Sequence, residues 1–160
     1  MTARQPPEWA PHEWVWIGFP SHADLWEDDL ESARAEVIAF ARAVDAGGKG
    51  EQVRLVAADP ESTARARELA GPDIEVVQEM FGDIWLRDTA PLILKGPGKS
   101  YAADFAFNGW GGKYELEGDD TIGRRLPISS RGDRPPGPSY RRGGGRSCRP
   151  PPAHICRPSR

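Results

Sequence analysis

A short segment in the middle of the chain, DIWLRD, places two carboxylates, a Trp and an Arg within six residues. If the segment is extended, successive side chains point to opposite sides, so Asp83 and Trp85 face one way and Asp88 the other. A carboxylate at a strand end suits a planar cationic ligand, because carboxylate and guanidinium form paired, charge-assisted hydrogen bonds. An internal Arg87 salt bridge beside a buried Trp is the structural alternative, and spacing alone favours it.

The elements around this segment alternate between strands and helices. Apolar residues at three- and four-residue steps predict a helix over Glu27–Ala46, and Asp59 before Pro60 predicts the start of another that ends at Ala70. A turn rich in Gly and Pro predicts a hairpin after the DIWLRD segment. The strands are expected at Val15–Phe19, Val53–Ala57, Ile74–Val77, Leu92–Leu94 and Tyr101–Phe105. This order indicates an α/β or α+β fold.

The chain divides near residue 120, and its two parts differ in composition. Residues 1–120 hold 11 Lys and Arg against 23 Asp and Glu, a formal charge of −12, and all six Trp. Residues 121–160 hold ten Arg, no Lys and one acidic residue, a formal charge of +9. Pro and Gly make up 14 of these 40 residues, above the roughly 25–30% typical of disordered sequence. We therefore expect one folded domain over 1–120 and a disordered tail over 121–160.

Two explanations of the basic tail are open. Arg, Gly, Pro, Ala and Ser dominate it, and their codons are largely GC-rich, so the favoured explanation is a frameshifted reading of a GC-rich gene. The alternative is a non-catalytic binding protein whose Arg-rich tail contacts the phosphates of nucleic acid. Basic arms usually mix Lys with Arg, which makes nucleic-acid binding the weaker interpretation.

The sequence offers no sign of a membrane segment or a secretory signal. It has no run of about 18 apolar residues and no apolar signal-peptide core, which predicts a cytoplasmic protein without membrane contact. Both Cys, Cys148 and Cys156, lie in the tail. Without a secretory signal, reduced thiols are expected rather than a disulfide.

Three motifs occur in order along the acidic part: EWAPHEWVW with FP after it, DIWLRDTAP, and DFAFNGWGGKY. In this combination the chain resembles the family of agmatine deiminases and bacterial peptidylarginine deiminases. The resemblance covers about residues 6–120, the N-terminal part of a full-length member. One departure is Ala90, where the family usually has Gly.

The resemblance implies an α/β propeller of the guanidine-modifying (pentein) type, a pseudo-symmetric ring of ββαβ-like modules around a narrow central site. This chain would supply one to two of the blades. Asp88 would hold the substrate guanidinium, and Trp85 would line the pocket beside the substrate's alkyl chain. Asp83 would orient or hydrogen-bond its neighbours. Arg87, between Trp85 and Asp88, would be structural. Asn108 and Trp110 belong to a family loop near the site entrance.

The implied reaction is hydrolysis of agmatine, or of peptidyl-arginine, to a ureido product and ammonia, which for agmatine serves putrescine biosynthesis. It uses no cofactor or metal. A Cys thiolate attacks the guanidinium carbon, while a His acts as acid and base. An acidic body of −12 would favour the approach of the cationic substrate.

The family's nucleophile and base lie in a Cys-x-x-Asn-Pro segment and a Gly-His-x-Asp segment, and neither is recognised in this sequence. Cys148, Cys156 and His154 have different neighbours, so these roles are not assigned to them. His12 and His22 also lie outside the catalytic segments, and His12 is expected to make a structural hydrogen bond. We therefore expect no catalytic residue in this chain and a truncated, inactive form of the enzyme.

Overall fold

A three-stranded parallel sheet forms the centre of the structure. The computed structural model of the chain describes residues 3–126. The strands are β1 (Val15–Gly18), β2 (Val53–Ala57) and β3 (Glu75–Gln78), paired in the order β1-β2-β3. Leu55, fully buried on the central strand, lies opposite a residue of each neighbour. Apart from Arg54, the residues of β2 are apolar and buried, as is typical of strands covered on both faces.

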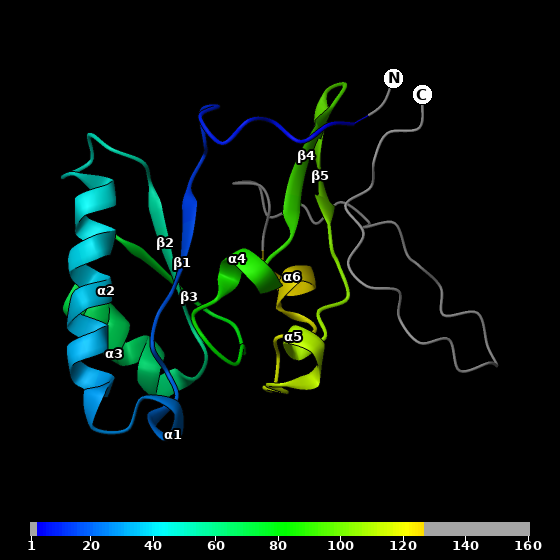
Figure 1. The fold of residues 1–160 in the computed structure, drawn as a ribbon. Coiled ribbons are helices and arrows are strands. Elements are labelled where there is room, and N and C mark those ends of the chain that lie inside the picture. Colours follow the sequence, from blue (N-terminus) through cyan, green and yellow to red (C-terminus); the bar gives the residue numbers. More distant parts are fainter. Residues whose placement is uncertain (1–2, 127–160) are drawn as a thin grey trace.

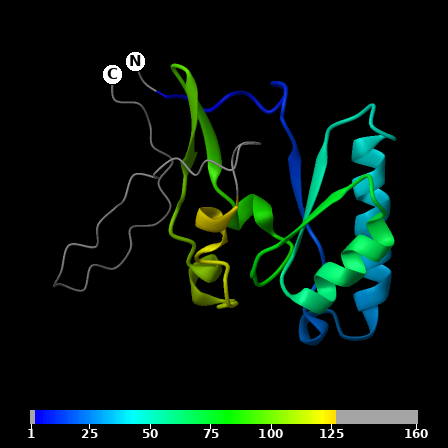
Figure 2. The ribbon, with the colours of Figure 1, turned by 180° about the vertical axis from the view of Figure 1, so that it is seen from behind.

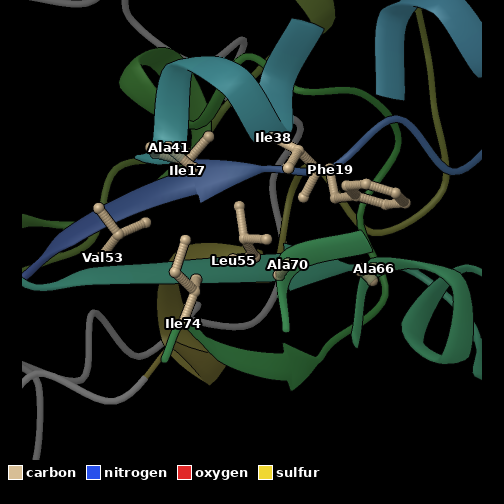
Figure 3. Close-up of a cluster of buried hydrophobic side chains, with 10 residues drawn as sticks. Ile17, Phe19, Ile38, Ala41, Val53, Leu55, Ala66, Ala70 and Ile74 are labelled. Atoms are coloured by element: carbon tan, nitrogen blue, oxygen red, sulfur yellow. The ribbon is translucent and has the colours of Figure 1, made fainter. Parts of the chain in front are cut away.

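Helices α2 (Leu30–Asp45) and α3 (Pro60–Ala70) cover one face of this sheet (Figure 1). Their apolar sides pack on the strands and form the main core (Figure 3), made of Ile17, Phe19, Ile38, Ala41, Val53, Leu55, Ala57, Ala66, Ala70 and Ile74. The order strand, helix, strand, helix, strand confirms the expected α/β class. Within residues 3–126, β1 and β3 each pair with β2 alone, so the described sheet is open at both edges.

The helix expected over Glu27–Ala46 begins later than the sequence pattern predicts. Two short elements precede α2: helix α1 (Ala23–Trp26) and a 3-10 turn, η1 (Glu27–Asp29). Glu27 has a φ of 47°, in a left-handed region that interrupts a right-handed helix. At the other end Ala46 is also left-handed, with φ 50° and ψ 37°, and the helix stops before it.

Both ends of α3 follow from local sequence chemistry. The Asp59 carboxylate accepts a hydrogen bond from the Ser62 amide at 2.9 Å, and Pro60 fills the first helical position, where no amide hydrogen is needed. Gly71, with φ 78°, follows the last helical residue. The strand predicted over 53–57 and the helix predicted after Asp59 are both confirmed.

A hairpin and three short helices lie on the other side of the sheet (Figure 2). The hairpin strands β4 (Leu92–Gly96) and β5 (Lys99–Ala103) are antiparallel, as expected, although the second strand begins and ends earlier than predicted. Gly98, with φ 74°, allows the tight turn between them. The N-terminal segment runs along the hairpin, where Arg4 and Lys95 exchange two backbone hydrogen bonds of 2.9 Å.

The three short helices are α4 (Leu86–Thr89), α5 (Gly109–Gly112) and α6 (Ile122–Arg125). A second core joins α4 and α6 to the free face of the sheet, and its buried members are Val56, Ala58, Phe81, Leu86, Ile122 and Leu126.

The folded part therefore continues past residue 120, where the sequence suggested that the tail begins. Ile122 and Leu126 are 0% and 1% exposed, and a spacing of four residues places both on the inner side of one helical turn. The described structure thus includes residues 121–126, which the sequence assigned to the tail. Residues 127–160 lie outside the described part of the chain. No helix within residues 3–126 is both long and apolar enough to cross a membrane.

Candidate functional site

Polar side chains gather beyond the carboxyl ends of the parallel strands. Ser21 follows β1, Asp59 follows β2 and Asp83 follows β3. The first two strand ends are tied together: Ser21 Oγ accepts a hydrogen bond from the Ala58 amide at 3.0 Å, and Ser62 Oγ donates to the Ser21 carbonyl at 3.2 Å. Ligands of parallel α/β sheets usually bind at this edge. One expected site residue, Asp83, therefore follows a strand end of the kind at which this sheet class usually binds ligands.

The DIWLRDT segment is helical at its end and not extended. Helix α4 spans Leu86–Thr89, with Trp85 at its N-cap. Leu86 and Thr89 are buried against the second core, because residues three apart share one side of a helix. Trp85 and Asp88, also three residues apart, share a different side, which is exposed. The alternation of an extended strand, which would separate them, is therefore wrong for this segment.

Asp83 holds the ring of Trp85 in place. Its Oδ2 accepts a hydrogen bond from the indole Nε1 at 2.9 Å, and its Oδ1 accepts one from the Ile84 amide at 2.8 Å. The expectation that Asp83 hydrogen-bonds its neighbours is confirmed. Trp85 is 54% exposed, so its anchored ring presents an open face to solvent, and the alternative of a buried Trp is wrong.

Arg87 pairs with the N-terminal segment and not with its neighbour Asp88. Its Nη2 donates to Glu8 Oε1 at 2.6 Å on the surface, and this hydrogen bond raises the pKa of the guanidinium. The Asp88 carboxylate is exposed and makes no hydrogen bond or ion pair with any residue of the described range 3–126. An unpaired carboxylate next to an exposed aromatic face can receive a cation from solvent.

The loop with Asn108 and Trp110 forms a separate feature. Asn108 Oδ1 accepts a hydrogen bond from the Gly111 amide at 3.0 Å and closes the turn. Trp110 is left-handed, with φ 54° and ψ 45°, and its ring packs edge-on against Phe107 and Tyr114 at centroid distances of 4.8 and 6.0 Å. A non-Gly residue in that conformation is uncommon.

A cavity of about 470 Å³ opens beside this loop. Its lining includes Asn108 and Tyr114 together with the carboxylate-bearing residues Glu115, Glu117 and Asp119. The residues of the DIWLRD segment are not among the lining residues. The structure therefore does not place the two groups of expected site residues around one cavity.

One residue that sequence analysis did not single out connects the two regions. Asp119 is 3% exposed, and its Oδ1 accepts a hydrogen bond from the Gly82 amide at 2.8 Å. Burial raises the pKa of this carboxyl, and the charge of Asp83 adds to the effect. In sequence Asp119 is one of two adjacent Asp in a polar stretch, which gives no signal of burial.

The histidines in the described range have structural contacts. His12 Nδ1 lies 3.0 Å from Glu51 Oε2, which confirms the expected structural hydrogen bond. His22 Nε2 donates to the Phe81 carbonyl at 2.8 Å. Over residues 3–126, no group of three or more His, Cys, Asp or Glu side chains could hold a metal ion. Cys148, Cys156 and His154 lie outside the described residues.

Comparisons with known proteins point to one family. The sequence model of the Porphyromonas-type peptidyl-arginine deiminase family matches residues 4–144. An Agmatine deiminase of Stutzerimonas stutzeri is 33% identical over 127 residues, which cover 76% of this chain and 34% of that protein. A protein of Streptomyces coelicolor, provisionally named an agmatine deiminase, is 43% identical over 114 residues, or 69% of this chain and 32% of that one.

Solved structures agree with the sequence comparisons. A structure of the agmatine deiminase of C. jejuni matches with a TM-score of 0.64 and 25% identity, over 78% of this chain and 36% of that one. A crystal structure of an arginine deiminase candidate from Porphyromonas gingivalis matches with a TM-score of 0.62 and 30% identity, over the same shares. The chain spans about a third of the length of these relatives.

Proposed function

Because the chain belongs to the Porphyromonas-type peptidyl-arginine deiminase family, we propose that Asp88 and Trp85 bind the guanidinium group of a small cationic substrate. Agmatine is the best candidate, since the relatives are named for it. The reaction that this binding serves is hydrolysis of the guanidine to a ureido group and ammonia. The observation that carries the proposal is the helical turn of α4, which brings Trp85 and Asp88 to the same exposed side.

The charge distribution around α4 supports a cationic ligand. Arg87, the nearest guanidinium in sequence, is engaged by Glu8 at 2.6 Å, so the charge of Asp88 has no hydrogen-bonded counter-ion in the described range. A guanidinium ligand can donate two parallel hydrogen bonds to such a carboxylate. The alkyl chain of agmatine would then lie on the Trp85 ring, whose plane is fixed by the hydrogen bond to Asp83 at 2.9 Å.

Two further expected residues, Asn108 and Trp110, are proposed to lie near the site without binding the guanidinium. Asn108 shapes the turn that carries Trp110, and their loop would border the site entrance in the complete enzyme. The acidic lining of the adjacent cavity, with Glu115 and Glu117, would attract a dicationic substrate through long-range electrostatics.

We propose that this chain takes part in binding but not in turnover. We propose that it supplies one to two blades of a pentein propeller, consistent with its coverage of about a third of the relatives. The Cys nucleophile and His base that the family resemblance implies are not recognised in the 160 residues. The chain is therefore proposed to bind a guanidine without hydrolysing it.

The test follows the indole N–H signal of Trp85 by NMR while agmatine is added. The signal is identified by its loss in Trp85→Phe. Putrescine, which has the same alkyl amine but no guanidine, is the matched control ligand. We expect agmatine to shift the signal and putrescine to leave it largely unchanged.

The charge of Asp88 is tested with Asp88→Asn. Hydrogen bonds to a charged group contribute about 1.5–3 kcal/mol, so we expect agmatine binding at least about 10-fold weaker, because 1.4 kcal/mol corresponds to a factor of ten. Asp24→Asn removes an exposed carboxylate from α1 and should leave the affinity unchanged. Equal responses to agmatine and putrescine, or equal affinities of Asp88→Asn and wild type, would refute the proposal.

A further inference from the structure

The loop between β3 and α4, residues 79–85, is held by groups from several parts of the chain. The sheet contributes first: the Glu79 amide donates to the Ala57 carbonyl at 3.0 Å. After β1, His22 Nε2 donates to the Phe81 carbonyl at 2.8 Å. These contacts fix the start of the loop, which leads directly to Asp83.

Asp119 holds the middle of the loop from a distant part of the sequence. Its carboxylate accepts from the Gly82 amide at 2.8 Å, across a separation of 37 residues. The approach is close, because a Cβ placed on Gly82 would lie 2.2 Å from Leu116 Cβ and 2.8 Å from Asp119 Oδ2. Only glycine allows this contact. Asp119 is 3% exposed, so water does not compete for its hydrogen bond.

Arg125 of α6 holds the beginning of the same loop. Its Nε lies 3.1 Å from Glu79 Oε2, and its Nη2 donates to the Met80 carbonyl. The guanidinium is itself oriented by Thr121, whose Oγ1 accepts from Nη1 at 2.6 Å. The planar guanidinium of Arg125 thus hydrogen-bonds both a backbone carbonyl and a side chain of the loop.

Helix α6, which carries Arg125, is anchored by buried side chains. Ile122 and Leu126, on the side that faces the sheet, are 0% and 1% exposed and share a core with Phe81. Burial of these apolar side chains away from water stabilises α6 in this position. The segment 118–126 is therefore packed both on the sheet and on Phe81 of the loop.

We infer that Asp119 and Arg125 are positioning residues, which fix the peptides of Met80–Gly82 and thereby hold the hydrogen-bonded pair Asp83 and Trp85 in the geometry that binds a guanidinium. The expected effect on guanidinium binding rests on the proposed function. The positioning of Asp83 and Trp85 is a property of the folded chain and does not depend on it. Neither residue touches the ligand, and each acts through the loop backbone.

The test uses the full chain and needs no ligand for its first readout. The Trp85 indole N–H donates to Asp83, so its NMR signal reports the geometry of that pair, while the other five Trp report the rest of the fold. In Asp119→Asn the side chain loses its charge and one of its two acceptor oxygens, which weakens the hydrogen bond from the Gly82 amide. We expect a shifted Trp85 signal and at least tenfold faster hydrogen exchange of the Gly82 amide. Asp120→Asn, a neighbouring exposed carboxylate, is the matched control and should change neither.

Arg125→Met provides a second, independent test, with the exposed Arg124→Met as its control. Arg124 contacts Asp104 at 2.6 Å and not the loop. We expect Arg125→Met to shift the Trp85 signal, while the other five indole signals stay in place. If Asp119→Asn loses all six signals and is unfolded, Arg125→Met decides the question alone.

Agmatine titration of the same variants separates the two proposals. We expect Asp119→Asn and Arg125→Met to weaken agmatine binding at least fivefold relative to their controls. An unchanged Trp85 signal and unchanged Gly82 exchange in a folded Asp119→Asn, or an unchanged Trp85 signal in Arg125→Met, overturns the positioning role. If wild type does not bind agmatine but the Trp85 signal moves as expected, the proposed function fails and the positioning role stands.

Discussion

Replacing Asp59 by Ala should destabilise the fold measurably, because this residue makes two hydrogen bonds at the start of α3. Oδ1 accepts from the Ser62 amide at 2.9 Å and Oδ2 accepts from the Ser62 hydroxyl at 2.8 Å. Loss of an N-cap side chain costs about 0.5–2 kcal/mol. The buried Ser62 hydroxyl also loses an acceptor, at a cost of about 1 kcal/mol, partly offset because it keeps the Ser21 carbonyl as a partner at 3.2 Å.

Together these terms predict that Asp59→Ala lowers the free energy of unfolding by about 2 kcal/mol at neutral pH. Urea unfolding followed by circular dichroism gives this quantity. Asp73→Ala is the matched control, since Asp73 is exposed in the loop after α3 and should change stability by less than about 0.5 kcal/mol.

The pH dependence of the Asp59 effect has a definite sign. Burial of this carboxyl opposes its ionisation, but the hydrogen bonds from Ser62 outweigh burial and lower its pKa. With a folded-state pKa below the unfolded value of about 3.9, the stabilisation is complete above that value and is lost as pH falls through the lowered pKa. The difference between wild type and Asp59→Ala should therefore shrink below about pH 4. Equal stabilities of Asp59→Ala and Asp73→Ala at pH 7 would refute the reasoning.

Three further predictions concern the function and the gene. Incubation of the purified chain with agmatine should release no ammonia, because a carboxylate and a Trp cannot replace a thiolate nucleophile; release that persists in a Cys148→Ser, Cys156→Ser double variant would contradict the mechanism. Trp85→Ala should weaken agmatine binding through lost apolar contact by about 1–3 kcal/mol, as measured by calorimetry. Translation of the other two reading frames of the coding DNA after codon 120 should recover a Gly-His-x-Asp segment followed by Cys-x-x-Asn-Pro; closed frames would favour a genuine tail.

Local sequence signals were sufficient where the structure depends on neighbouring residues. Strand β2 and helix α3 match their predicted ranges, because the apolar run and the Asp59 cap act within a few residues. The start of α2 was missed, since the left-handed Glu27 (φ 47°) has no sequence signal of its own. The α/β class could be read from the alternation of elements.

The site depends on contacts between residues far apart in sequence, and these could not be predicted. The spacing of the DIWLRD segment is compatible with a strand or a helical turn, and burial of Leu86 and Thr89 against the second core decides for the turn. The burial of Asp119 and the contacts of Arg125 depend in the same way on how α6 packs. Ile122 and Leu126, four residues apart, were a usable signal of that helix, but the Arg-rich composition around them obscured it.

The hydrogen bonds that Asp119 and Arg125 make to the loop before α4 can form only late in protein synthesis. Strands β1 to β3 and helices α2 and α3 use residues up to Gln78, so this part of the sheet can begin to fold while the chain is still being made. The contacts that hold the loop of Asp83 are incomplete at that stage, because Arg125, which contacts Met80 across 45 residues, is translated later. Until α6 leaves the ribosome, the nascent protein has a sheet but lacks the contacts from α6 to residues 79–85.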